Sequence, residues 1–266
     1  MTQAIRLTPS LREKVWGKTR LEPWFANSAS LIGEAWFVAD RELPLLVKLI
    51  FTSERLSVQV HPDDGEDGPR GKTEMWHILE AEPGAAIAVG FREPITRARL
   101  LEATRSGEVE RLLNWIEVKP GETYFTPAHT VHAIGAGIVL CEIQQNSDVT
   151  YRLWDYGRPR PIQVEKAVPI ADLSVHPGAA QPMRVNEHRD ELVRARQFVT
   201  ELVRLGAGAT EMPEHHNCQL WIAIEGSGTI GGEAWRRGEV WLLPEAGAQP
   251  EVKASHLGRF LRTWVP

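Results

Sequence analysis

Apolar and polar residues alternate along short runs of the chain, and glycine and proline separate these runs. In RLSVQVH (55–61) the alternation is strict. Because successive side chains of a strand point to opposite faces, Ser57, Gln59 and His61 share one face. A polar face of this kind is usual for a strand at the edge of a sheet. Here, however, a carboxamide and an imidazole point the same way just before a proline, and this spacing is typical of metal ligands.

The pattern along the rest of the chain predicts a mainly β protein. Runs rich in Val, Ile, Leu, Trp and Thr predict strands at 31–39, 43–51, 55–61, 73–81, 85–91, 123–127, 137–145 and 149–156. Closely spaced antiparallel strands favour a barrel or a sandwich. Apolar residues at helical spacing, interrupted by a Ser-Gly pair, predict two short helices within 94–116. Several prolines without alternation predict a linker or an irregular wrap over 159–182.

A second run of strands follows this linker. It predicts strands at 194–205, 218–231, 239–245 and 258–266. The spacing of glycine and proline in GETYFTP (121–127) recurs in GEVWLLP (238–244), which indicates an internal repeat. Two histidines follow the first copy, and the corresponding stretch after the second copy has none. We therefore expect two β modules, a catalytic one at 1–158 and a degenerate one without metal at 183–266.

Composition narrows the classes of function. The net charge of −5 over 266 residues provides no basic surface for nucleic acid. No segment approaches the roughly 18 to 20 apolar residues that span a bilayer. Cys141 and Cys218 lie in no metal-type grouping, and the first residues lack the apolar core of a signal peptide. The sequence thus predicts a cytoplasmic protein without a nucleic-acid or membrane partner, and it leaves the oligomeric state open.

Four residues form a candidate set of metal ligands: Gln59, His61, Glu74 in GKTEMW and His132 in PAHTVHAIG. Imidazole nitrogen with carboxylate and carboxamide oxygen suits zinc or a similar divalent ion. With a dication the set has a net charge of about +1, which favours a Lewis acid over a neutralised structural site. Each residue alone also has an ordinary explanation as a surface or hydrogen-bonded side chain. His77 and His129 are competing ligands, although both are more typical of supporting or surface positions.

Four segments, in this order, closely resemble the type I mannose-6-phosphate isomerases of the cupin superfamily: LPLLVKLIFTSERLSVQVHPDD, GKTEMWHIL, GETYFTPAHTVHAIGAG and CEIQQNSDVTYRLWDYGR. The similarity covers residues 15–158 almost continuously and becomes general cupin similarity afterwards. Because the chain lacks a large helical insertion, it resembles the compact bacterial members. The resemblance implies two tandem cupin-like (jelly-roll) β-barrels with a short helical insertion. It also implies one zinc ion per chain, bound by Gln59, His61, Glu74 and His132.

The resemblance further implies roles for residues of the pocket. Arg152, Glu142 and Lys72 correspond to family positions that we expect to be catalytic. Ser57, Lys72 and Arg158 are expected to bind the substrate, since guanidinium and ammonium groups suit a phosphate.

Two features of the pocket stay open at this point. Glu142, expected to lie near Arg152, is the favoured proton shuttle, but His61 or a metal-bound water could serve instead. The family has a glycine two residues after the turn proline, where this chain has His129. This departure puts the conformation of that loop in question.

The chemistry of the residues agrees with an isomerase. Moving a proton between adjacent carbons through an enediol is redox-neutral, and the chain has neither GxGxxG after a strand nor GxxxxGK[ST]. A metal beside the two sugar oxygens would stabilise developing negative charge. The predicted function is therefore metal-dependent interconversion of mannose 6-phosphate and fructose 6-phosphate. The alternatives are another metal-dependent cupin enzyme, such as an oxygenase, and a non-catalytic sugar-binding cupin.

Overall fold

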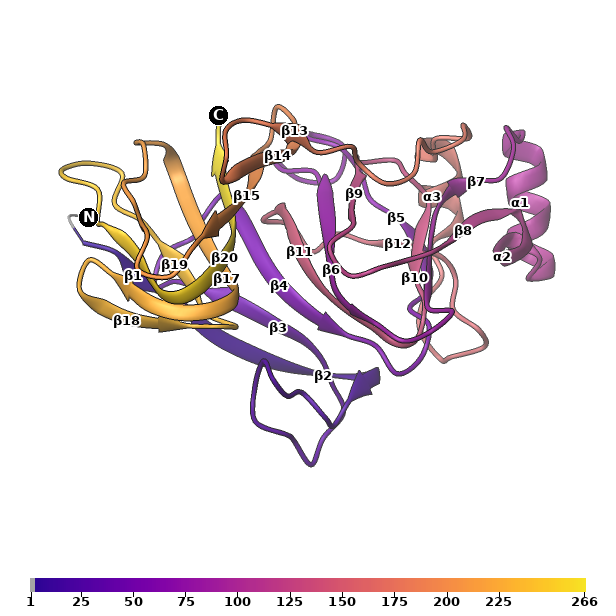
Figure 1. The fold of residues 1–266 in the computed structure, drawn as a ribbon. Coiled ribbons are helices and arrows are strands. Elements are labelled where there is room, and N and C mark those ends of the chain that lie inside the picture. The colour runs from indigo at the N-terminus through magenta and orange to yellow at the C-terminus, as the bar shows by residue number, and fades with distance from the viewer. Residues whose placement is uncertain (1–2) are drawn as a thin grey trace.

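The strands of the chain form three sheets in the computed structural model, which describes residues 3–266 (Figure 1). The six-stranded sheet has the order β2 (Thr8–Lys18), β3 (Ile32–Val38), β4 (Leu45–Phe51), β11 (Ile138–Gln145), β6 (Glu74–Ala81), β9 (Thr123–Thr126). The five-stranded sheet has the order β12 (Tyr151–Trp154), β5 (Val58–Val60), β10 (His132–Ile134), β7 (Ala86–Phe91), β8 (Leu113–Glu117).

The third sheet contains nine strands. Its main path is β1 (Ile5–Arg6), β19 (Val240–Leu242), β17 (Asn217–Ile230), β20 (Val252–Val265), β15 (Val199–Leu205), β14 (Arg189–Arg194), β13 (Met183–Arg184). Two short strands lie off this path, β16 (Thr210–Glu211) beside β20 and β18 (Glu233–Arg236) beside β17. The prediction of a mainly β protein is confirmed. None of the three sheets closes into a barrel within the described residues, so the division into two tandem barrels stays a prediction.

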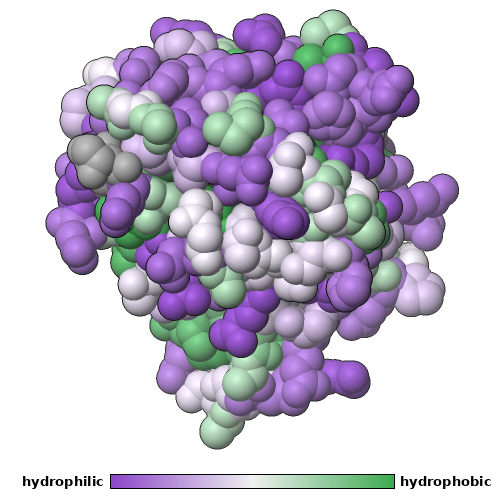
Figure 2. Space-filling view, turned by 60° about the vertical axis from the view of Figure 1, so that its left-hand side comes forward, coloured by the Kyte–Doolittle hydropathy of each residue, from purple (hydrophilic) through white to green (hydrophobic). Residues whose placement is uncertain are grey.

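The six-stranded sheet lies between the other two, and this explains its long apolar strands. Every residue of β4 and β11 is buried. Val47 and Leu49 of β4 pack with Leu220 and Leu261 of the third sheet. On the opposite face, Ile50 packs in a cluster with residues of the five-stranded sheet. A strand covered on both faces reads as a continuous hydrophobic run because neither face meets water. Figure 2, which looks toward the third sheet, shows a mostly hydrophilic surface with apolar residues in limited groups.

Three helices cover the outer face of the five-stranded sheet: α1 (Arg97–Ser106), α2 (Val109–Leu112) and α3 (Val164–Ile170) (Figure 1). The Thr96 side chain caps α1, which ends at Gly107 with φ of 78°. Both α1 and α2 fall within 94–116, where two short helices are expected, but the last residues of that range form β8. The segment expected to be a linker contains α3. No helix among residues 3–266 is long and apolar enough to cross a membrane.

Two of the sheets place oppositely charged pairs at matching positions. The order β14-β15-β20-β17-β19 parallels β3-β4-β11-β6-β9. In the six-stranded sheet, Glu142 pairs in register with Lys48, and a tryptophan lies on the other side of it. In the third sheet, Arg262 pairs with Glu201, again with a tryptophan on its other side. The first pair, Lys48 and Glu142, lines a cleft that is described below. In the second pair, Arg262 is completely buried.

Replacing Arg262 by methionine is expected to lower the free energy of unfolding by about 3 to 5 kcal/mol, because it removes the 3.3 Å ion pair with Glu201 and leaves this buried carboxylate with only the longer, 3.8 Å contact to Arg189. The Arg262 Nε atom also donates a hydrogen bond of 2.7 Å to Gln219 Oε1, which the variant loses. Arg259→Met is the matched control, since Arg259 lies on the same strand but is half exposed and pairs with Glu225. Urea unfolding measures both variants, and equal losses would contradict this account of Arg262.

Candidate metal centre and active-site cleft

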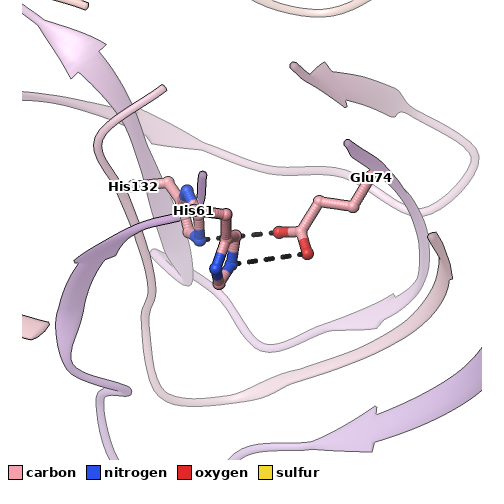
Figure 3. Close-up of side chains that lie close together, drawn as sticks. All are labelled: His61, Glu74 and His132. Carbon is pink, nitrogen blue, oxygen red and sulfur yellow. Dashed lines mark ion pairs between the residues drawn. The ribbon is translucent and has the colours of Figure 1, made fainter. Parts of the chain in front are cut away.

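The four predicted ligands converge between the six-stranded and the five-stranded sheets. Gln59 lies in β5 and pairs in register with His132 at the start of β10. His61 follows β5, and Glu74 is the first residue of β6. The two imidazoles lie side by side, and the carboxylate of Glu74 faces both of them (Figure 3), 3.6 Å from His61 Nε2 and 3.5 Å from His132 Nε2. One potential ligand atom from each of these three residues lies within 4.8 Å of the others.

Backbone carbonyls fix both imidazoles in the orientation that metal ligation requires. Nδ1 of His61 lies 2.9 Å from the carbonyl oxygen of Val149, and Nδ1 of His132 lies 2.8 Å from that of Thr130. Each Nδ1–H donates to its carbonyl, so the Nε2 lone pairs point toward Glu74. Burial first, and the positive charge of Lys72 second, lower the pKa of His132 to about 3. Both causes also hold the pKa of His61 well below its usual range, so both rings are neutral.

The donor set fits a divalent metal. Glu74 is completely buried, and its Oε1 atom has no hydrogen-bond partner among the described residues. A buried carboxylate oxygen without a partner is costly in a folded protein, and a cation would satisfy it. Gln59 Nε2 lies 3.2 Å from His132 Nε2. A half-turn of the Gln59 carboxamide exchanges its nitrogen and its oxygen, and would bring the oxygen next to the His132 imidazole. Two imidazoles, a carboxylate and a carboxamide are ligands that suit zinc and similar ions.

Lys72 supplies the positive charge beside this cluster. Its ammonium forms an ion pair with Glu74 and lies 3.1 Å from His61 Nε2. Glu142 Oε1 is 3.9 Å from Lys72 Nζ. A divalent cation on Glu74 would repel this ammonium, and Glu142 offers it another partner. Lys72 thus lies within reach of both carboxylates.

Glu142 is an ionised carboxylate in a buried polar cluster. Lys48 Nζ donates to Glu142 Oε1 at 2.9 Å, and Trp76 Nε1 donates to Oε2 at 3.0 Å. Burial disfavours the charged form, but the positive charges of Lys48 and Lys72 outweigh it and lower the pKa of Glu142 to about 2. Glu142 is thus held by lysines, whereas the sequence led us to expect Arg152 beside it.

A cleft of about 220 Å³ opens above this cluster. Its walls include Ser57, Gln59, Lys72, Glu142, Arg152 and the rings of Trp16 and Trp36. The cations outnumber the acids in its lining: Arg12, Lys14, Lys48, Lys72, Arg152 and Arg160 against Glu34, Glu142 and Asp148. An excess of positive charge favours an anionic ligand. A larger cavity of about 510 Å³ lies elsewhere, around 172–181 and 192–194, but it contains none of the ligand residues and is mainly apolar.

Two arginines that are close in sequence differ in whether they line the cleft. Arg158, expected to bind the substrate, does not line the cleft; it pairs with Asp155 at 3.2 Å and Glu54 at 3.0 Å. Arg160 lines the cleft instead. Sequence reasoning overlooked Arg160 because it lies among the prolines of the expected linker. It also overlooked Lys48, whose only signal is a lone charge inside the apolar run LPLLVKLIF.

His129 occupies its loop in a conformation that suits glycine. Its φ is 74°, in the left-handed region where a side chain costs energy. Its backbone N–H donates to the carbonyl oxygen of His61 at 2.8 Å, and its Nε2 atom lies 2.8 Å from Glu66 Oε2. The loop therefore keeps the glycine-like backbone, and it connects to a metal ligand through the main chain. His129 and His77 both lie outside the three-residue cluster.

Fold and site together define a mainly β protein with a buried His–Glu–His cluster that could hold a metal ion, next to a cationic cleft. No protein-family model matches the chain. The chain is 31% identical to "Putative mannose-6-phosphate isomerase YvyI" of Bacillus subtilis, over 92% of this chain and 94% of that protein. It is 29% identical to mannose-6-phosphate isomerase ManA of the same organism, over 91% and 93% of the two chains. The chain belongs to the mannose-6-phosphate isomerase family.

Solved structures agree with this membership. The crystal structure of mannose 6-phosphate isomerase from Bacillus subtilis matches with a TM-score of 0.88 and 26% identity, covering 98% of this chain and 99% of that one. Phosphomannose isomerase from Salmonella typhimurium matches with a TM-score of 0.80 and 18% identity, covering 99% and 100%. At that identity the second match supports the fold alone.

Proposed function

We propose that the protein is a zinc-dependent aldose–ketose isomerase that interconverts mannose 6-phosphate and fructose 6-phosphate. The observation that carries this proposal is the buried cluster of His61, Glu74 and His132, with Gln59 next to His132 and in the wall of a cationic cleft. These four residues would hold one zinc ion. When bound there, zinc would supply a Lewis acid that polarises the oxygens on the two reacting carbons of the sugar.

The residues of the chain would handle the proton and the charge. The reaction removes the proton on C2 of the aldose, passes through an enediol and adds a proton to C1, while the hydroxyl proton on O2 shifts to O1. No external electron acceptor is needed, since C1 is reduced as C2 is oxidised. Glu142 is our candidate for carrying the carbon proton. Lys72, which reaches both Glu74 and Glu142, would donate to the developing oxyanion.

The low pKa of Glu142 adds a condition to its role. A carboxylate with a pKa of about 2 is a weak base, so proton transfer to it requires that its contacts with Lys48 and Lys72 loosen. A negatively charged substrate that enters the cleft would compete for both ammonium groups. Substrate binding would then raise the basicity of Glu142 at the moment of reaction. Arg152 would stabilise negative charge on the substrate, and Ser57 would contact the sugar near the ligands, since both line the cleft.

The two alternatives have less support. Two histidines and a carboxylate are also the donor set of non-haem iron oxygenases, but such an enzyme needs open coordination positions, and Gln59 as a fourth ligand would occupy one of them. A sugar-binding protein without catalysis would be expected to lack a ligand or the cleft arginine, and this chain has all of them. Membership of the isomerase family further favours catalysis.

An assay of fructose 6-phosphate formation from mannose 6-phosphate tests the proposal. We expect turnover by the purified protein loaded with zinc, and no oxygen consumption with the same sugar. Absence of turnover in protein that contains one zinc per chain would contradict the proposed activity.

The cytoplasm is the compartment that we propose for this enzyme. Cys141 and Cys218 are both buried and unpaired, which suits a reducing environment. Burial also raises the pKa of the Cys218 thiol to about 11, so that it stays protonated and unreactive.

A further inference from the structure

A buried aspartate orients two arginines at the end of β12. Asp155 is buried, and its side chain is 1% exposed. Its Oδ2 atom accepts a hydrogen bond of 2.6 Å from Arg160 Nε, and its Oδ1 atom accepts another of 2.6 Å from Arg160 Nη2. This fork fixes the plane of the Arg160 guanidinium. Arg158 makes a single contact with the same carboxylate, 3.2 Å from Nη1 to Oδ1.

The two guanidinium groups differ in where their remaining N–H donors point. Arg158 Nη2 donates to Glu54 at 3.0 Å and to the carbonyl oxygen of Arg55 at 2.8 Å, so its charge is used outside the cleft. Arg160 lines the cleft, and its Nη1 atom donates to no group in the described part of the chain. Arg160 therefore has a fixed orientation and a free donor on the substrate side.

Arg152 faces the same space with its charge uncompensated. No carboxylate oxygen of residues 3–266 lies within 4.0 Å of its guanidinium, and its buried Nε atom has no hydrogen-bond partner in this range. Burial first, and the positive charge of Arg160 second, lower the pKa of Arg152, while Asp155 offsets this only in part. Arg152 and Arg160 line the same cleft and repel each other, and an anion bound beside both would offset this repulsion.

We infer that Arg160, held by Asp155 and facing Arg152, binds the phosphate group of the sugar substrate and gives the enzyme its selectivity for phosphorylated sugars. This inference rests on the proposed function. Arg152 pairs in register with the candidate ligand Gln59, whereas the hydrogen bonds of Arg160 go to Asp155, just after the end of β12. We therefore assign Arg160 to the phosphate group of the substrate, and Arg152 to the part of the substrate near the candidate ligands. Asp155 is a positioning residue, because it acts only through the arginine.

The test compares Arg160→Ala with Arg158→Ala, which removes the neighbouring arginine bound to the same aspartate. We expect Arg160→Ala to raise the KM for mannose 6-phosphate roughly 10- to 100-fold, the effect of losing one or two charge-assisted hydrogen bonds, with kcat changed less than about threefold. The inhibition constant of inorganic phosphate should rise in parallel. Turnover of unphosphorylated mannose should match that of the wild type. Arg158→Ala should change each of these values less than about threefold, because Arg158 does not line the cleft.

Two further variants distinguish positioning from folding. Arg160→Lys keeps the charge without the fork and should recover part of the lost affinity. Asp155→Asn should raise the KM without lowering kcat in proportion, and Asp155→Glu should partly reverse this. Circular dichroism and thermal melting identify any variant that fails to fold. If Arg160→Ala does not fold, Arg160→Lys is compared with Arg158→Ala in its place. An unchanged KM and phosphate inhibition in both Arg160 variants would overturn the inference, as would an equal rise in Arg158→Ala.

Failure of this inference can be distinguished from failure of the proposed function. Titration calorimetry with inorganic phosphate measures binding without any turnover. If the wild type binds phosphate but converts no mannose 6-phosphate, weaker binding in Arg160→Ala would still support the arginine site. If the wild type is an active isomerase and Arg160→Ala binds phosphate as the wild type does, the arginine site is wrong and the isomerase remains.

Discussion

Replacing Glu74 by glutamine is expected to reduce kcat/KM for mannose 6-phosphate by a factor of about a thousand or more and to release the metal. Glu74 is the only charged residue of the three-residue cluster, and its carboxylate lies 3.6 Å from one imidazole and 3.5 Å from the other. Glutamine has nearly the same shape but carries no charge to offset a dication. The loss of a Lewis acid removes several kcal/mol of transition-state stabilisation, which corresponds to this factor.

Kinetics and elemental analysis of the same sample measure both effects of Glu74→Gln. Glu102→Gln is the control, since Glu102 is exposed on α1, on the helix side of the five-stranded sheet. It should retain wild-type metal content and turnover. A Glu74→Gln protein that keeps its metal and loses less than about tenfold in turnover would show that the cluster is not the catalytic centre.

Replacing Arg152 by alanine is expected to lower kcat/KM about 100- to 1000-fold while the metal content stays at the wild-type level. Among residues 3–266, Arg152 and Arg12 are the cleft cations without a carboxylate partner, and Arg12 stacks over Trp36, so the charge of Arg152 is available to the substrate. It also lies next to Gln59 in the sheet, close to where negative charge develops. Both kcat and KM should therefore change, in contrast to the KM effect expected for Arg160.

Arg152→Lys and Arg99→Ala complete this comparison. Lysine should restore part of the rate, since it returns the charge but not the planar fork. Arg99 lies on α1 and pairs with Glu102 at 3.1 Å, so its removal should leave turnover unchanged. Wild-type kinetics in Arg152→Ala would assign Arg152 a structural role only.

The proximity of the four candidate ligands is predictable from sequence because these residues lie in or at the ends of strands with a fixed register. Gln59 and His61 share a face by strand parity, and β10 brings His132 opposite Gln59. The charge partners follow no such local rule. The partner of Glu142 is Lys48, which lies on a strand 94 residues away, so only the pairing of β4 with β11 identifies it.

The buried strands of the first half are predictable because both faces of the six-stranded sheet are covered, and their apolar runs are continuous. Strand β2 lacks this pattern, since most of its residues are exposed or partly exposed. Strand β10 has only three residues and follows a loop that contains histidine. Helix α3 contains Pro169, which reads as a helix breaker in sequence. These elements are stabilised by contacts with other parts of the fold, and such contacts cannot be predicted from the periodicity of a single segment.

The most direct measurement follows metal removal and return in one sample. The protein is stripped with a chelator, its metal content is determined, and zinc is added back in steps while the rate with mannose 6-phosphate is recorded. We expect no turnover in the metal-free protein, and a rate that rises linearly and stops at one zinc per chain. Full turnover by protein shown to contain no metal would contradict the central claim that His61, Glu74 and His132 form the catalytic metal centre.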